Sequence, residues 1–407
     1  MKKNTILLAV FCILLVSGGC LNRTSKKQNL SALDSQRISE NQWDSPLLER
    51  EINYSVYSPD TTDEKKPVVV YLINLPGPRL GELDDKTLIE GFLNDGMTVI
   101  VADYESDPLA AGPELLPEID LWYGYCFKTK DYPLDPNWIY IIPAGYAIDR
   151  KVRICEIGDR PVDMDVIYPS GETSMVPLML QITSTKQLGK WVNQRAYYVY
   201  GLLTRGYAGA IMDWNGGRQV SPVGRVFPEK QAARLLRANT EKWNLTGKLG
   251  VTGHSKASGR AAMAVFINEE GFEDDKGPHA EESDRFQVAL MSAGQHAKEF
   301  LIEDGYLDEV SQRQGEAALK QRKEVPAEVI RIASTYAYVT ADDPPAFLSV
   351  GALDKKFRVG QMKRLAAQCE EVGLEYRFIL QEDMGHMYNP DPEVIGEIFS
   401  FFDTYLK

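Results

Sequence analysis

Positive charge is in short supply in this chain of 407 residues. It has 45 Lys and Arg against 58 Asp and Glu, which gives a formal net charge of −13 at pH 7, and no cluster of basic residues stands out. Binding to nucleic acid or to an anionic membrane surface depends on concentrated Lys and Arg. The composition therefore argues against both kinds of partner.

Cysteine and histidine are also scarce, with five and four residues respectively. The three cysteines in the body of the chain, Cys126, Cys155 and Cys369, lack metal-site spacing and can form at most one disulfide. Isolated buried thiols are the more frequent case for such residues. A catalytic metal needs a cluster of His or carboxylate ligands, and we find none, so we predict neither metal nor cofactor. The acidic stretches within 269–284 lack calcium-loop spacing, and we expect a solvated surface loop.

The apolar run at the N-terminus, from Thr5 to Val16, is too short to span a membrane. It follows a basic start and ends in small residues before Cys20, which is the order of a secretory signal. A cysteine directly after Gly-Gly resembles a bacterial lipoprotein signal, which implies an exported protein anchored in the cell envelope by a lipid on Cys20. An ordinary cleaved signal is the alternative. We assign residues 1–20 to the signal peptide and the polar stretch 21–45 to a tether.

The most informative segment of the chain runs from Leu249 to Arg260 and reads LGVTGHSKASGR. An apolar strand leads into a sharp turn with Ser255 at its apex, and an Ala-rich helix follows. The small residues Gly253 and Ala257 lie two positions to either side, which lets strand and helix pack closely around a strained turn. A serine presented in this way is a candidate nucleophile once a base takes its proton. The alternative is a serine that caps the helix.

An acid and a base follow the ends of two later strands. The apolar run 346–350 ends shortly before Asp354, and the predicted strand 376–380 precedes His386, with a helix-periodic stretch between them. The weaker candidates for the acid precede the first of these strands and lie at its opposite end. They are Asp342 and Asp343, and the weaker candidates for the base are His254 in the turn, His279 in the acidic stretch and His296 after another strand.

The chain order Ser255, Asp354, His386, each just past a strand end, resembles the α/β-hydrolase superfamily. The resemblance is closest to the dienelactone-hydrolase and feruloyl/acetylxylan-esterase-like branches, where an Asp-Asp-Pro-Pro segment like 342–345 precedes the acid-bearing strand. It implies an α/β fold of the hydrolase type, a mostly parallel sheet flanked by helices, over residues 151–407.

The same resemblance implies a mechanism. His386 deprotonates Ser255 for attack on an ester carbonyl, while Asp354 holds the imidazole in the required tautomer. The negative oxygen that develops needs fixed hydrogen-bond donors. These are expected to be the backbone N–H groups of Lys256, which follows the nucleophile, and of Thr183 or Ser184 after an earlier strand.

Two departures from the family pattern stand close to these residues. The turn has Ala257 where a second glycine is usual, a change that a small residue tolerates. After the acid, Lys355-Lys356-Phe357-Arg358 stands where the named branches more often have Val-Pro. The second departure bears on the branch more than on the triad.

The substrate class that the resemblance implies is a small-molecule or polysaccharide ester, such as acetylated or feruloylated xylan. A serine peptidase of the prolyl-oligopeptidase type is the nearest alternative enzyme, although it usually carries a β-propeller and the chain has no repeat of 40–50 residues. A hydrolase fold kept as a glycan-binding surface scaffold, without catalysis, is the alternative from another class. Oligomeric state stays open.

The chain matches itself at an offset of 110 residues without gaps. The position that matches Ser255 is Gly145, and no histidine precedes residue 254, so the first copy cannot perform this chemistry. We predict a smaller degenerate hydrolase-like α/β unit at 46–150 before the catalytic domain at 151–407. Chance similarity between strand-helix units is the alternative. The matched residues are Pro67 with Pro177, Gly96 with Gly206, Asp103 with Asp213, and Arg150 with Arg260.

The first copy also carries a group of aromatic residues, Trp122, Tyr123, Tyr125 and Trp138. Such side chains stack on sugar or aryl rings in some binding sites. In most proteins, however, large aromatic side chains of this kind belong to the core. We therefore predict that they are core residues.

Overall fold

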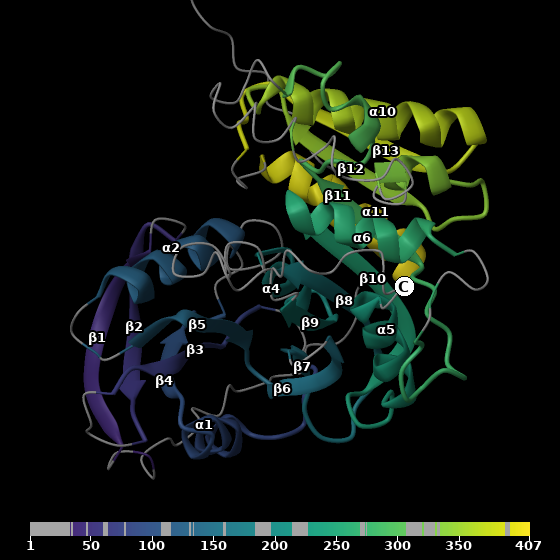
Figure 1. Ribbon diagram of the computed structural model, residues 1–407. Coiled ribbons are helices and arrows are strands. Elements are labelled where there is room, and N and C mark those ends of the chain that lie inside the picture. The colour runs from purple at the N-terminus through teal and green to yellow at the C-terminus, as the bar shows by residue number, and fades with distance from the viewer. Residues whose placement is uncertain are drawn as a thin grey trace, which may run out of the picture.

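The computed structural model contains two β-sheets with helices on their faces (Figure 1). Five strands form the first sheet and eight form the second. The residues that the structure describes are 33, 36–45, 48–59, 64–76, 79–106, 115–129, 132, 134–157, 160–183, 197–213, 227–268, 273, 275–306, 320, 330–331, 334–386 and 391–407.

The first sheet comprises β1 (Arg37–Ser45), β2 (Arg50–Tyr57), β3 (Lys66–Ile73), β4 (Thr98–Asp103) and β5 (Leu134–Pro143). Their order is β1-β2-β4-β3-β5, with antiparallel pairs at the β1 edge and parallel pairs on both sides of β3. The Val-Val-Val-Tyr-Leu run of β3 fits this central place, because a parallel strand is covered on both faces. Helices α1 (Asp85–Asn94) and α2 (Leu115–Lys128) cover opposite faces of the sheet (Figure 1).

The second sheet has the order β13-β12-β11-β10-β8-β9-β7-β6. Its strands are β6 (Tyr146–Ile157), β7 (Arg160–Pro169), β8 (Val176–Thr183), β9 (Ala208–Asp213), β10 (Leu245–His254), β11 (Val288–Ser292), β12 (Ala346–Gly351) and β13 (Tyr376–Gln381). The helical elements that follow these strands are α4 (Tyr197–Leu203), α5 (Pro228–Ala238), α6 (Lys256–Phe266), η4 (Lys298–Phe300), η5 (Thr335–Tyr338), α10 (Lys356–Val372) and α11 (Pro392–Leu406).

The two faces of the second sheet belong to two separate cores. Along β8, Met179 packs with α4, α11 and the whole first unit, whereas Leu178 and Leu180 pack with α5, α6 and α10. This alternation follows from the period of two along a strand. One core therefore extends from the first sheet into the second.

The two sheets repeat one topology at the sequence offset of 110 residues. The order β1-β2-β4-β3-β5 matches β6-β7-β9-β8-β10, with the same parallel and antiparallel pairs. The registers agree as well. Val68 opposes Thr98 and Ile139 in the first sheet, while Leu178 opposes Ala208 and Leu249 in the second. Chance similarity does not predict this agreement in register, whereas an internal duplication does.

The two units are joined by hydrogen bonds between buried groups. The hydroxyl of Tyr200 in α4 donates to the Ile139 carbonyl of β5 at 3.0 Å. The hydroxyl of Tyr140 in β5 donates to Asp165 of β7 at 2.7 Å. Together with the shared core, these bonds tie the first unit to the second.

Strands at two places differ from the predicted domain boundaries. β1 occupies Arg37–Ser45, inside the stretch assigned to the tether, and β6 begins at Tyr146, five residues before the predicted start of the second unit. An antiparallel edge strand with a polar face has too few apolar residues to show a clear pattern in the sequence. Cys20 lies outside the described residues, and among those described no helix is long and apolar enough to cross a membrane.

The aromatic group of the first unit lies in its core. Trp122 is fully buried, and its Nε1 donates to the hydroxyl of Tyr104 at 2.9 Å. Tyr125 packs edge-on against Trp122, while Trp138 is half-buried beneath the guanidinium of Arg150. The side chain of Tyr123 lies outside the described part. The prediction of core residues is thus confirmed for Trp122, and nothing shows a sugar platform.

The cysteines of the body of the chain are free thiols. Cys126 and Cys369 are buried, and Cys155 is half-buried. Burial raises the pKa of the Cys126 thiol well above its usual value, and it raises those of Cys155 and Cys369 to about 12. These thiols are therefore protonated and unreactive near neutral pH.

The acidic segment after α6 is not the solvated loop that its composition predicts. Arg234 of α5 donates to both carboxylate oxygens of Glu273 and to Asp284, and Lys230 also contacts Asp284. The side chains of Lys230 and Arg234 are 6% and 4% exposed. The sequence pattern missed this because the basic partners lie on a helix about 40 residues earlier.

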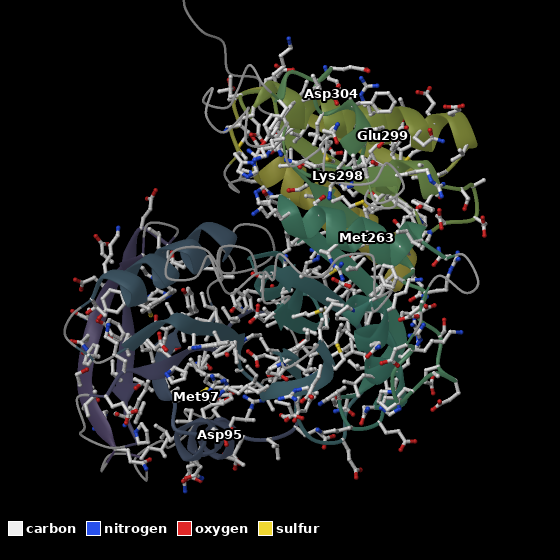
Figure 2. All side chains as sticks on the ribbon, in the orientation of Figure 1. Asp95, Met97, Met263, Lys298, Glu299 and Asp304 are labelled. Atoms are coloured by element: carbon white, nitrogen blue, oxygen red, sulfur yellow. The ribbon has the colours of Figure 1, made fainter. Side chains whose placement is uncertain are left out.

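The segment after β11 is fastened to α10. Gln361 donates to the Ala297 carbonyl at 2.7 Å and accepts from its N–H at 2.8 Å. Asp304, labelled beside α10 in Figure 2, accepts from Gln361 and Arg364. These contacts hold α10, whose N-terminus lies next to Asp354, against the chain that leaves β11.

Candidate active site

Ser255 stands in a strained turn between β10 and α6. Its backbone has φ 58° and ψ −116°, a conformation that residues other than glycine rarely adopt. A Cβ at Gly253 would meet the carbonyl oxygen of Ala257 at 2.3 Å, so this turn requires glycine two residues before the serine. The Ser255 side chain makes no capping hydrogen bond to α6, which removes the helix-cap alternative.

The structure brings the three predicted residues together. His386 Nε2 lies 3.1 Å from Ser255 Oγ, and His386 Nδ1 lies 2.8 Å from Asp354 Oδ2. A carboxylate only accepts hydrogen bonds, so Nδ1 carries the proton and Nε2 is the acceptor that faces the serine hydroxyl. Asp354 follows β12 and His386 follows β13, and these strands are neighbours in the sheet. The parallel strands thus deliver all three side chains to one edge.

Asp354 is held as an anion out of contact with water. Its side chain is 0% exposed, and Oδ1 accepts from the Lys355 N–H at 2.6 Å and from Arg358 Nη1 at 3.1 Å. Burial by itself raises the pKa of this carboxyl. The hydrogen bond from His386, its charge, the Lys355 N–H and the Arg358 cation together outweigh burial and lower the pKa below its usual value.

The predicted oxyanion donors lie beside this turn in part. Lys256 is the first residue of α6, directly after Ser255. Thr183 ends β8, where Ile182 opposes Gly253 in register. The Thr183 hydroxyl is buried and, among the described residues, has no hydrogen-bond partner. Ser184 lies outside the described residues, as do the loop residues 215–218 expected to shape the substrate pocket.

The other candidate acids and bases lie elsewhere or serve the core. Asp343 accepts from Asn268 and Thr340 before β12 begins, at the end of the strand away from Ser255. His296 is fully buried between Ser258 and Thr335, at 3.1 and 3.0 Å. No three His, Cys, Asp or Glu side chains in the described part of the chain are grouped to hold a metal.

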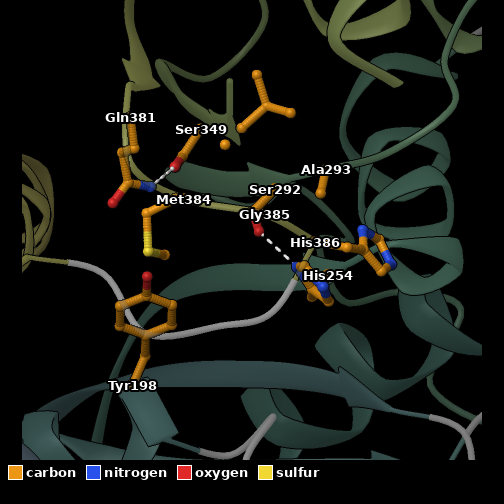
Figure 3. A pocket seen from close by; sticks show the side chains of 11 residues that line it. Tyr198, His254, Ser292, Ala293, Ser349, Gln381, Met384, Gly385 and His386 are labelled. Carbon is orange, nitrogen blue, oxygen red and sulfur yellow. Dashed lines mark hydrogen bonds between the residues drawn. The ribbon is translucent and has the colours of Figure 1, made fainter. Parts of the chain in front are cut away.

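His254, which precedes the nucleophile, takes part in the site in a way the sequence did not reveal. Its ring lies 4.9 Å from the His386 ring, tilted by 36°, and its Nδ1 is 2.7 Å from Ser292 Oγ. A small cavity of about 20 Å³ opens behind these rings (Figure 3). Gln381 and Ser349, bonded at 2.8 Å, line its far side together with Met384 and Tyr198. Because Ser255 does not line it, this cavity lies behind the candidate base and is not the substrate pocket.

Solved structures identify the class of fold. A truncated carbohydrate esterase from gut microbiota aligns with a TM-score of 0.50 at 15% identity, over 64% of this chain and 97% of its own. Butyrate-bound esterase 2 from the planctomycete Thermogutta terrifontis aligns with a TM-score of 0.50 at 17% identity, over 63% and 95%. Esterase B from Lactobacillus rhamnosis gives a TM-score of 0.52 at 15% identity, over 72% and 95%. The fold is that of an α/β-hydrolase.

The family follows from the sequence match. The family model described as BD-FAE matches residues 164–369, which is half of the chain. The chain belongs to the BD-FAE family of α/β-hydrolases, and this confirms the predicted superfamily and fold class. The match includes Ser255 and Asp354 and ends before His386. A comparison with curated proteins gives no match.

Proposed function

We propose that this protein is a serine ester hydrolase that works through an acyl-enzyme on Ser255. One observation carries the proposal: the hydrogen-bonded series from Ser255 Oγ through His386 to Asp354, at 3.1 and 2.8 Å. A hydroxyl, an imidazole acceptor and a buried carboxylate in this order activate a serine as nucleophile. The strained turn supports the same reading, since it lifts the hydroxyl away from the helix that follows.

In the proposed reaction, Ser255 Oγ attacks the ester carbonyl while His386 Nε2 takes its proton. The bond to the alcohol then breaks, and His386 returns the proton to the leaving oxygen. A water molecule, deprotonated by the same imidazole, releases the acid and restores the serine. The Lys256 and Thr183 N–H groups are the proposed donors to the developing oxyanion, and such a donor contributes about 2.7–4 kcal/mol to lowering the barrier.

The proposed substrates are carbohydrate esters that carry acetyl or feruloyl groups. The likeness to the feruloyl/acetylxylan-esterase-like branches supports this class, and one structural neighbour is described as a carbohydrate esterase. The described strands form the two sheets of Figure 1, and no propeller blades of the kind that accompany the alternative peptidase appear among them.

A fluorophosphonate probe tests the proposed nucleophile directly. We expect covalent labelling of the purified chain at Ser255, mapped by mass spectrometry, and a kcat for ester hydrolysis lower by roughly 10⁴-fold or more in Ser255→Ala. Ser400→Ala, a change of an exposed serine on α11, is the matched control and keeps both labelling and turnover. A folded wild-type chain that neither labels nor hydrolyses any ester would instead favour a glycan-binding scaffold.

The proposal includes a place in the cell: export to a bacterial envelope, with a lipid on Cys20 as anchor. The motif Gly18-Gly19-Cys20 after a short apolar run supports it. We expect the wild-type protein in the membrane fraction with a lipidated N-terminal Cys20 peptide, and Cys20→Ala in the soluble or unprocessed fraction. An N-terminus beyond residue 20 on the mature protein would point to ordinary cleavage instead.

A further inference from the structure

The helix after Asp354 begins with a residue pattern that departs from the named family branches. Arg358 lies one turn into α10 and reaches back to Asp354, with Nη1 at 3.1 Å from Oδ1. This is the carboxylate oxygen that does not face His386, which bonds to Oδ2 at 2.8 Å. One buried carboxylate therefore links a permanent cation on one side to the candidate base on the other.

This ion pair differs from the usual pair at spacing i, i+4 on a helix surface. Exposed pairs contribute little, because water screens the charges. Here the Asp354 side chain is 0% exposed, and that of Arg358 is 18% exposed. The charge of Arg358 therefore acts on the carboxylate through a medium of low dielectric, where Coulomb interactions are stronger.

We propose that Arg358 is a positioning residue of the triad, which orients the Asp354 carboxylate and keeps His386 unprotonated, and so able to act as a base, at lower pH. This inference rests on the proposed function of the site. It deepens that function by adding a residue that touches neither the nucleophile nor the base.

The physical reason is a competition for the field of one anion. Asp354 favours a proton on His386 because it stabilises the imidazolium. A cation on the other carboxylate oxygen offsets part of that field, so protonation of the ring requires a more acidic solution. A protonated ring cannot accept the proton of Ser255. The cation therefore extends activity toward acid.

The other groups that face these residues can be held constant in the test. Among the described residues, His386 contacts Ser255, Asp354 and the ring of His254, and Arg358 contacts Asp354 and the ring of Phe357, at 5.2 Å from its centroid. His254 and Phe357 stay unchanged in every variant, so their effects cancel in the comparison.

The test is the pH dependence of kcat/KM for a chromogenic acetyl ester in four proteins: the wild type, Arg358→Gln, Arg358→Lys and Lys363→Gln. We expect Arg358→Gln to move the acid limb upward by about 0.5 pH unit, or about threefold less activity on the acid side, with the alkaline plateau retained. Arg358→Lys keeps the cation and stays near the wild type. Lys363→Gln removes an exposed cation farther along α10 and superimposes on the wild type.

A second readout does not depend on turnover. In the Ser255→Ala background, NMR of ¹³C-labelled histidine follows the titration of His386, assigned by comparison with His386→Gln. The inference expects the same upward shift when Arg358→Gln is added. A shift without any ester hydrolysis in the wild type would sink the proposed function but keep the positioning role.

Ester hydrolysis with superimposed pH profiles would overturn the positioning role and keep the function. So would a loss of activity by one factor at every pH. If Arg358→Gln and Arg358→Met both fail to fold while Arg358→Lys folds, the arginine serves structure and the inference is wrong.

Discussion

At the scale of single residues, the backbone of Ser255 shows how the site stores strain. A residue other than glycine held at φ 58°, ψ −116° costs roughly 1–3 kcal/mol and persists only where its surroundings impose it. The Ser255 N–H donates to the Ser292 carbonyl at 2.8 Å, and His254 opposes Ser292 in the parallel register of β10 and β11. The neighbouring strand therefore holds the turn in place.

The glycine before the serine is expected to be essential for this turn. Gly253→Ala places a methyl group against backbone atoms of Ala257 and Ser258, at 2.3–2.8 Å, which cannot move without the helix. We expect a loss of roughly 1–3 kcal/mol in the free energy of unfolding, measured in urea, and slower fluorophosphonate labelling. Gly259→Ala, where the nearest atom is 3.7 Å away, is the control and keeps wild-type stability or gains up to about 1 kcal/mol. Equal behaviour of the two variants would contradict this account of the turn.

At the scale of elements, buried polar groups tie the helices around the sheet to one another. Glu229 of α5 and Arg260 of α6 form a bidentate pair at 2.6 Å with both side chains buried. Between α6 and η5, His296 bridges Ser258 and Thr335. Breaking a buried pair of this kind costs more than an exposed contact because a polar group is left without a partner.

His296 makes part of the stability depend on pH. Burial lowers the pKa of its imidazole to about 3, against about 6.5 in the unfolded chain. Below pH 6.5 the unfolded chain takes up a proton that the native state refuses, so stability falls as the solution becomes more acidic. We expect this histidine alone to lower the free energy of unfolding by about 1.5–2 kcal/mol between pH 6.5 and 5.

The measurement is urea denaturation of the wild type and His296→Gln at both pH values. The variant should be less stable at pH 6.5 but lose less stability on acidification, by the amount given above. His279→Gln, in a surface turn, serves as the histidine control with the wild-type dependence. An unchanged acid loss in His296→Gln would mean that His296 binds a proton in the native state.

At the scale of the whole molecule, one architecture occurs twice with different outcomes. Where the second unit has Ser255, the first has Gly145, which also has a positive φ, of 90°. There the N–H donates to the hydroxyl of Tyr71, which donates to Asp85, itself paired with Arg79. Side chains of the protein thus occupy the place that corresponds to the active site, and the chain continues into β6 instead of a helix.

The parts of the candidate site that the sequence predicted share one property: each signal is local. Ser255, Asp354 and His386 follow strand ends within a few residues, and parallel strands always bring such ends to one edge. The repeat at an offset of 110 residues was visible for the same reason, and its register is confirmed in the paired strands. The boundaries near residues 45 and 150 failed because polar edge strands carry little hydrophobic signal.

By itself, the sequence determined the class of fold, the order of nucleophile, acid and base, and the presence of a second, degenerate copy, because strand periodicity and turn residues are properties of neighbours along the chain. Only the tertiary structure decided that Arg358 binds the buried Asp354, that His254 lies against His386, and that α5 neutralises the acidic segment. These contacts join residues whose proximity or direction depends on packing, and burial then sets how strongly their charges act. A charged residue in a sequence carries no mark of the dielectric in which the fold will place it.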